Sequence, residues 1–224
     1  MENMINFNDM TMPGENSRDK TLLANLPVEV FLERLGSGMP TPGGGATAAL
    51  DAAQGAALVM MVANHTIGKK KYAEYEELNV RVRDDAEELL EELMGGIDKD
   101  AFAFSAVSEA YALPKDNARL RTAKIASASA DAAIAPLEVM IASVKALKLA
   151  NLLLGHSNKN LESDIYVAAL SLQAGLVSAK YNVEANMPAI GKVSAESVEK
   201  LQYMVNNEMM KGLGLANLIL TEMG

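Results

Sequence analysis

The run Pro40-Thr41-Pro42-Gly43-Gly44-Gly45, followed directly by the apolar segment 46–63, most constrains how this chain can fold. Proline disfavours helix in the residue before it, and glycine opens backbone angles that other residues avoid. The run therefore predicts a fixed loop that leads into the N-terminus of a long helix. Free N–H groups at such an N-terminus favour an anionic or polar ligand. The simpler alternative is a tight turn that lets two helices approach closely.

Two common nucleotide-binding loops are excluded for this run. A Walker loop needs Gly-Lys-Ser/Thr after its glycines, and here Ala46 and Thr47 follow instead. A dinucleotide-binding loop follows a strand, whereas these glycines follow two prolines. The segment thus predicts a helix start without either nucleotide motif.

The composition narrows the class of protein. Half of the residues are hydrophobic but only 4% are aromatic, so the core is built from small and aliphatic side chains. The net charge of −9 argues against a nucleic-acid partner, which usually needs a basic face. The absence of cysteine excludes disulfides and thiolate catalysis and suits a cytoplasmic location. Within 46–63, Asp51 and Gln54 favour a buried helix over a membrane span.

Apolar residues recur at helical spacing along the chain, and no segment alternates as a strand does. We predict an all-α fold, a single-domain bundle of long helices over residues 25–224, after a flexible tail over 1–24. Gly95-Gly96 is expected to interrupt or kink the third helix, and Pro136 to kink the fourth. The helices are expected at 27–35, 44–66, 72–113, 117–154, 164–182 and 194–223.

Asp98 and Asp100 are the candidate acid–base residues, beside the predicted break at Gly95-Gly96. Two residues apart on a regular helix, their side chains diverge by about 200°. Both therefore enter one site only if the helix is irregular there, and for each alone a solvated surface acid is the simpler interpretation. Burial would raise the pKa of such an acid and suit it to proton transfer.

The charged and imidazole side chains elsewhere give weaker signals. Lys69, Lys70 and Lys71 form either a solvated patch or a site for a carboxylate-bearing substrate tail. His65 and His156 lack the spacing of metal ligands, so no metal is predicted.

Polar residues also gather near the expected ends of the fifth helix. Ser163 or Asp164 suits an N-cap, and Asn158 precedes them in the same loop. Asn182 and Asn186 have apolar neighbours, and buried amides need partners. Asn182 and Asn186 therefore indicate a polar pocket.

Taken in order, these motifs resemble the cyclodeaminase/cyclohydrolase family of folate enzymes, over about residues 27–220. The chain departs from the family pattern at Ser157, where a glycine is usual, at Ala46, where a small residue such as serine is usual, and at Asp51, where a small apolar residue is common. The motifs that carry the resemblance are Pro42-Gly43-Gly44-Gly45, Gly68-Lys69-Lys70-Lys71-Tyr72, Asp98-Xaa-Asp100 ahead of Ala103-Phe104, Leu113-Pro114-Lys115, Arg121-Thr122, Pro136, Asn158, Ser163-Asp164 and Asn182-Val183 to Asn186.

The resemblance implies an all-helical homodimer with the folate site near the subunit interface. It gives Asp98 and Asp100 the acid–base and cation-stabilising work, and it implies no cofactor apart from the tetrahydrofolate derivative that is the substrate, free or polyglutamylated. The asparagines would orient the reacting groups, and the lysines with Arg121 would meet the glutamate tail. The implied substrate-binding residues are Pro42, Gly43, Gly44, Gly45, Lys69, Lys70, Lys71, Tyr72, Arg121, Asn158, Ser163, Asp164, Asn182 and Asn186.

Three functions follow from the resemblance. The favoured prediction is formiminotetrahydrofolate cyclodeaminase, which forms 5,10-methenyltetrahydrofolate and releases ammonia. The alternative is methenyltetrahydrofolate cyclohydrolase, which opens the methenyl ring to 10-formyltetrahydrofolate. The candidate from another class is a non-catalytic helical dimer that binds folate or scaffolds a partner enzyme.

Overall fold

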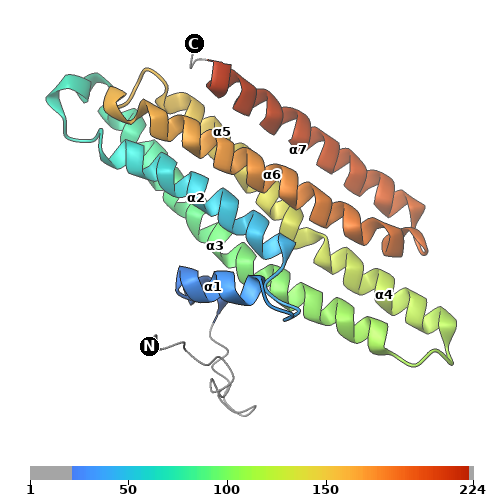
Figure 1. Cartoon of the computed structure of the whole chain (residues 1–224). Helices are drawn as coiled ribbons and strands as arrows, with labels where there is room; N and C mark the ends of the chain where they lie inside the picture. Colours follow the sequence, from blue (N-terminus) through green and yellow to red (C-terminus); the bar gives the residue numbers. More distant parts are fainter. Residues whose placement is uncertain (1–21, 222–224) are drawn as a thin grey trace, which may run out of the picture.

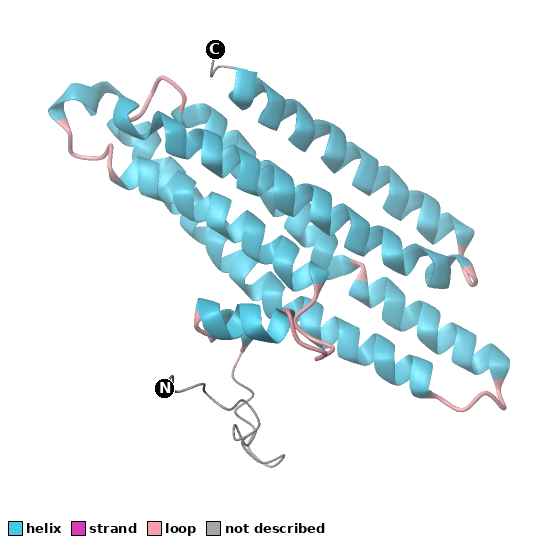
Figure 2. Ribbon diagram, in the orientation of Figure 1, coloured by secondary structure: helices cyan, strands magenta, loops and turns pink. Residues whose placement is uncertain are grey.

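Long helices make up most of the computed structural model, which describes residues 22–221 (Figure 1). Within this range there are helices, turns and loops but no strand, which confirms the predicted all-α bundle (Figure 2). The α-helices are α1 (Val28–Leu35), α2 (Gly44–Asn64), α3 (Glu76–Ala112), α4 (Ala118–Ala132), α5 (Ile134–Leu153), α6 (Glu162–Gly191) and α7 (Ala195–Thr221). Three short 3-10 helices are η2 (Leu23–Asn25), η3 (Lys70–Tyr75) and η4 (Lys159–Leu161).

Helix α2 packs against α3, α5 and α6 and buries most of its small apolar residues. It is the one helix in the described residues that is long and apolar enough to cross a membrane by length and composition. Its interior position accounts for that composition, because a helix packed on three sides needs apolar residues around much of its circumference.

Small residues let α2 and α6 approach to backbone contact. A Cβ added at Gly175 of α6 would lie 2.7 Å from the Cβ of Ala52 and 2.8 Å from the carbonyl oxygen of Ala48. A Cβ added at Gly55 of α2 would lie 2.9 Å from the carbonyl oxygen of Ala168. Glycine therefore permits close approach of two helices along the α2–α6 contact itself, and this role is separate from that of the glycines in the loop before α2.

Helix α3 runs without interruption from Glu76 to Ala112, so the predicted break at Gly95-Gly96 is wrong. Gly96 instead faces the core, where an added Cβ would lie 3.3 Å from Val139 and 3.4 Å from Ala49. Gly95 faces open space. The glycine pair thus reflects close packing on one side of a continuous helix, which a single sequence does not distinguish from a break.

Two further boundaries differ from the prediction. The expected helix 117–154 is two helices, since α4 ends at Ala132 and α5 begins at Ile134. Pro136 therefore lies in the first turn of α5, where its missing N–H costs no hydrogen bond. Helix α6 continues to Gly191, beyond the expected end at 182.

The N-terminal boundary also changes. Leu23 and Ala24 fall in the predicted tail but form part of η2, whose N–H groups are held by α3, as described below. Residues 1–21 of the predicted tail lie outside the described residues.

We expect Gly175→Ala to lower the free energy of unfolding by about 1–3 kcal/mol, because the added methyl meets the backbone of α2. Gly95→Ala is the matched control, where the methyl meets nothing and the variant should gain about 0.5–1 kcal/mol of helix stability. Urea unfolding followed by circular dichroism measures both. Equal effects of the two substitutions would contradict the packing described here.

Candidate functional site

The N-terminus of α2 lies against Asp100 of α3. The backbone N–H of Ala46 donates to Asp100 Oδ2 at 3.0 Å. A Cβ added at Gly45 would overlap the same carboxylate. The glycines before Ala46 therefore allow an acid from another helix to serve as the N-terminal cap that Gly43 does not provide.

Burial raises the pKa of Asp100, and the hydrogen bond from Ala46 offsets part of that rise. The carboxyl group is half-buried, and one of its oxygens receives the Ala46 N–H. A raised pKa makes a carboxylate a better proton acceptor than a solvated aspartate, which suits Asp100 to acid–base chemistry.

Two asparagines of α6 extend this arrangement. Asn182 Oδ1 lies 3.4 Å from the position that a Cβ on Gly44 would take, while its Nδ2 donates to the Ser178 carbonyl at 2.9 Å. Asn186, one turn further along, donates from Nδ2 to the Asn182 carbonyl at 3.0 Å. The structure thus brings Gly43, Gly44, Gly45, Asp100 and Asn182 together, with Asn186 adjacent on the same helix.

Asp98 does not share this site. Its carboxylate is buried and accepts the N–H of Leu23 at 2.6 Å and the N–H of Ala24 at 3.4 Å. Since α3 is continuous here, Asp98 and Asp100 diverge as two residues on a regular helix must. Asp98 therefore holds η2 against α3, and Asp100 alone reaches the start of α2.

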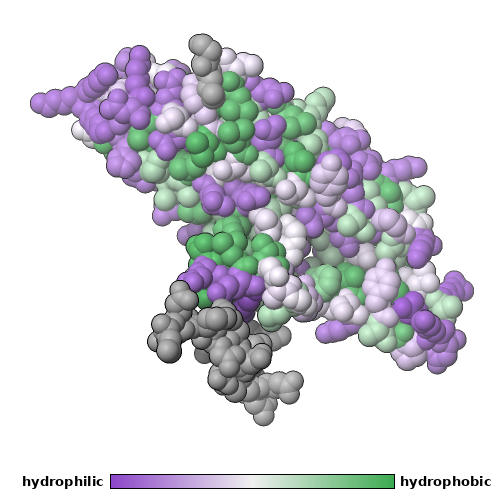
Figure 3. Space-filling model, in the orientation of Figure 1, coloured by the Kyte–Doolittle hydropathy of each residue, from purple (hydrophilic) through white to green (hydrophobic). Residues whose placement is uncertain are grey.

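A second group of predicted residues lies at the other end of α2, about 30 Å away for a helix of this length. The Asn158 N–H donates to Thr66 Oγ1 at 2.9 Å, and the Lys159 N–H donates to Tyr72 Oη at 3.1 Å. That donation lowers the pKa of the Tyr72 hydroxyl. Lys69, Lys70 and Lys71 are exposed beside them, at a tip of the bundle whose surface is mainly hydrophilic (Figures 1 and 3).

The remaining predicted residues are also away from Asp100. Ser163 and Asp164 lie in the first turn of α6, near Asn158, but neither caps that helix. Arg121 donates to the carbonyls of Tyr111 at 2.7 Å and Leu113 at 3.1 Å, and it lies 5.8 Å from the Tyr111 ring centre. Arg121 thus closes the turn between α3 and α4, and Tyr111 is about 16 Å along α3 from Asp100.

No role was predicted for Asn79, which the structure places at the junction between α3 and the loop after α5. It is fully buried, and its Nδ2 donates at 2.9 Å to the carbonyls of both Tyr75 and His156. It occupies a core position of α3, between the apolar Leu78 and Val82. An amide at a position where the helical period predicts a buried apolar residue is the signal that would have identified it.

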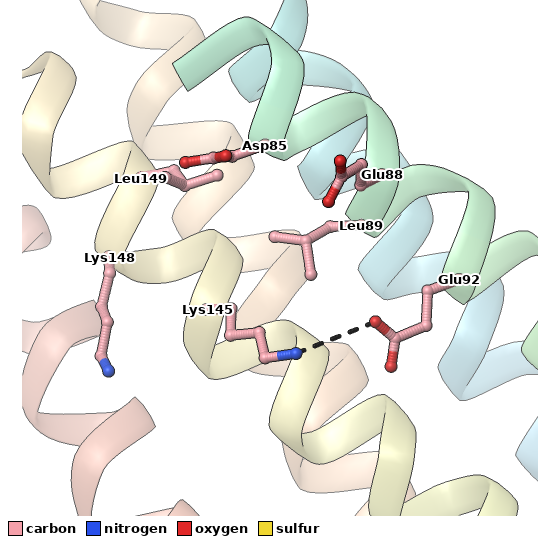
Figure 4. A pocket seen from close by; sticks show the side chains of 7 residues that line it. All are labelled: Asp85, Glu88, Leu89, Glu92, Lys145, Lys148 and Leu149. Atoms are coloured by element: carbon pink, nitrogen blue, oxygen red, sulfur yellow. Dashed lines mark ion pairs between the residues drawn. The ribbon is translucent and has the colours of Figure 1, made fainter. Parts of the chain in front are cut away.

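An open groove between α3 and α5 has a volume of about 330 Å³ (Figure 4). Charges of both signs line it, and Lys145 Nζ lies 4.0 Å from Glu92 Oε2. None of the predicted site residues is among those that line it, which are Asp85, Glu88, Leu89, Glu92, Lys145, Lys148 and Leu149. Among residues 22–221, no three His, Asp or Glu side chains gather as metal ligands.

The chain is similar to proteins of known activity. A family profile described as Formiminotransferase-cyclodeaminase matches residues 27–206. The methenyltetrahydrofolate cyclohydrolase of Methylorubrum extorquens is 44% identical over 168 residues, which are 74% of this chain and 81% of that protein. The formimidoyltransferase-cyclodeaminase of Gallus gallus is 31% identical over 178 residues, which are 77% of this chain but 32% of that longer protein.

A solved structure has the same fold. The crystal structure of formiminotetrahydrofolate cyclodeaminase from Thermotoga maritima matches with a TM-score of 0.79 and 28% sequence identity. The match covers 87% of this chain and 94% of that one.

We expect Asp98→Ala to release η2, because the N–H groups of Leu23 and Ala24 lose their acceptor. Loss of a typical hydrogen bond costs about 0.5–1.5 kcal/mol. Hydrogen exchange at Leu23 should accelerate, while Asp85→Ala, an exposed acid on the same helix, should leave it unchanged. Unaltered exchange in Asp98→Ala would show that the carboxylate does not hold this segment.

Proposed function

Because the chain belongs to the formiminotransferase-cyclodeaminase family, as its motifs predicted, we propose that it is a folate one-carbon enzyme with methenyltetrahydrofolate cyclohydrolase activity. The supporting observation is the similarity to the Methylorubrum enzyme, which extends over most of both chains. The sequence alone favoured the cyclodeaminase. The comparison supports the alternative better, because the match to the Gallus gallus protein has lower identity and covers a third of its length.

Asp100 is the proposed acid–base residue. In the first step, a water oxygen attacks the cationic methenyl carbon while the Asp100 carboxylate takes one proton from the water. The carboxylate also stabilises the positive charge of the substrate before attack. Its place at the start of α2 supports this role, because it is half-buried and hydrogen bonded by a single backbone N–H.

In the second step the ring opens. The bond between the former methenyl carbon and N5 breaks, and N5 takes the proton from Asp100. The hydroxyl proton passes to solvent as the carbonyl forms, which leaves a formyl group on N10. One water is consumed and one proton is released, so the same carboxyl group serves as base and then as acid. Asn182 and Asn186 orient the pterin on the side of α6.

Cyclodeaminase activity is the second candidate, supported by the Thermotoga maritima structure that the chain matches over almost its whole length. In that reaction, N10 of 5-formiminotetrahydrofolate attacks the formimino carbon, the N10 proton is removed, and ammonia leaves after protonation. Asp100 can move both protons. The cyclodeaminase reaction therefore uses the same site as the cyclohydrolase reaction. The leaving group is ammonia in the first and N5 in the second.

A homodimer with a shared substrate site is also part of the proposal. The residues assigned to the substrate fall into two groups at opposite ends of α2, so one chain does not bring them together. Helix α6 exposes an apolar stripe at helical spacing, which a second copy packed antiparallel would cover. Its members are Val167, Leu170, Ala174, Tyr181 and Pro188. In such a pair, the lysine tip of one chain meets the Asp100 end of the other.

The first measurement offers purified protein each substrate and follows the near-ultraviolet absorbance of the methenyl compound. Loss of absorbance from 5,10-methenyltetrahydrofolate, faster than without protein, supports the cyclohydrolase. A gain of absorbance with ammonia release from 5-formiminotetrahydrofolate supports the cyclodeaminase. Binding without turnover of either compound would leave the scaffold function.

Asp100→Asn should lower kcat by about 100- to 10,000-fold. The fold should persist, because the asparagine oxygen still accepts the Ala46 N–H. In the wild type, kcat/KM should fall as the pH drops through the Asp100 pKa, which burial raises. A pH–rate profile measures this limb. Near-normal turnover in the variant would remove Asp100 from the mechanism.

The shared site predicts rescue between two impaired variants. Joint replacement of Lys69, Lys70 and Lys71 by alanine should raise KM, and Asp100→Asn should lower kcat. When the two proteins are unfolded and refolded together, one site in each mixed dimer regains both groups. Activity of the mixture above the sum of the two variants refolded separately, measured at a substrate concentration below the KM of the lysine variant, supports the shared site. No rescue would place each site within one chain.

A further inference from the structure

The core-facing stripe of α3 continues past Asp100. Leu89, Leu93 and Gly96 lie on this stripe and are buried. At helical spacing, the same side of the helix then presents Asp100, Phe104, Val107 and Tyr111. The stripe is therefore apolar on both sides of a single acid.

The covering of this stripe changes at Asp100. Helix α2 lies over the part before it, as the contact of Gly96 with Ala49 shows, and α2 begins at Gly44 with its first turn on Asp100. Helices α3 and α4 run on past the start of α2 (Figure 1). Beyond Asp100 the side chains are open, with Phe104 exposed by 47% and Tyr111 by 50%.

We propose that Phe104 binds the aminobenzoyl ring of the substrate, and that the substrate extends along α3 from Asp100 toward Tyr111 and Arg121. This inference rests on the proposed function. Phe104 is one helical turn, about 6 Å, from Asp100 on the same side of α3. The aminobenzoyl ring carries N10, and N10 is bonded to the carbon on which Asp100 acts in the proposed mechanism. A ring at Phe104 would therefore place this carbon near Asp100.

The chemistry of the face fits a flat ring with an anionic tail. An exposed phenyl group offers stacking and apolar contact, and its burial under a ligand removes apolar area from water. Beyond Phe104 the face leads to Tyr111, beside which the Arg121 guanidinium lies. The charge of Arg121 suits the glutamate that follows the aminobenzoyl ring.

Phe102 supplies a matched control. It is a second phenylalanine of α3, exposed by 54%, and two residues from Asp100 it points to the opposite side of the helix. Its replacement removes the same side chain from the same helix. The experiment therefore compares Phe104→Ala with Phe102→Ala, and adds Phe104→Tyr, which keeps a ring.

The probes are tetrahydrofolate and p-aminobenzoylglutamate, a fragment that has the ring and tail but no pterin. Equilibrium binding of both is measured by calorimetry, with circular dichroism to confirm the fold. Phe104→Ala should weaken both by about tenfold, in the range of an aromatic contact. Phe102→Ala should bind as the wild type does, and Phe104→Tyr should restore most of the affinity.

The outcomes separate the two proposals. If the wild type binds tetrahydrofolate and Phe104→Ala binds as tightly as Phe102→Ala, the role of Phe104 is overturned while the proposed function stands. If Phe104→Ala loses tetrahydrofolate but keeps the fragment, Phe104 does not hold the aminobenzoyl ring and the inference is overturned. If the wild type neither binds nor converts any tetrahydrofolate derivative, both proposals fail.

Discussion

Close approach between α2 and its neighbours is the constraint on which the rest of the structure depends. At Gly175 and Gly55 there is no room for a side chain between α2 and α6, and at Gly45 there is none between α2 and α3. A helix packed this closely has little freedom to shift along its axis, because steric overlap rises steeply in a close-packed interior. The start of α2 is therefore held where the Ala46 N–H meets Asp100.

The position of that start determines the character of the candidate site. An acid that reached the middle of α2 would be enclosed by apolar side chains, and an acid on a free surface would be solvated. Asp100 lies at the boundary, with buried neighbours on one side and an exposed aromatic face on the other. Burial raises its pKa while a helix N–H favours its charged form. The partial burial of Asp100 therefore depends on where α2 begins as much as on the presence of an aspartate at this position.

Helical periodicity made most of the fold predictable, because apolar positions report which side of a helix is covered. It failed where the same residue type serves two purposes. Gly95-Gly96 suits a break or a close contact, and the deciding partners Val139 and Ala49 are distant in sequence. Asp98 and Asp100 look alike in a motif, yet one holds Leu23 and the other meets Ala46. Only the tertiary contacts separate them.

The division between these two acids narrows the chemistry that the site can perform. Asp98 is engaged by backbone N–H groups of η2, so of these two acids only Asp100 lies at the start of α2, and the proposed mechanism gives it every proton transfer. A single group can complete either reaction only if it takes a proton in one step and returns it in the next. That cycle favours a pKa near the working pH, and burial moves the Asp100 pKa in that direction. In the proposed mechanism, the choice between water and ammonia depends on the other groups at the start of α2, and Asn182, which is adjacent to Gly44, is the first candidate.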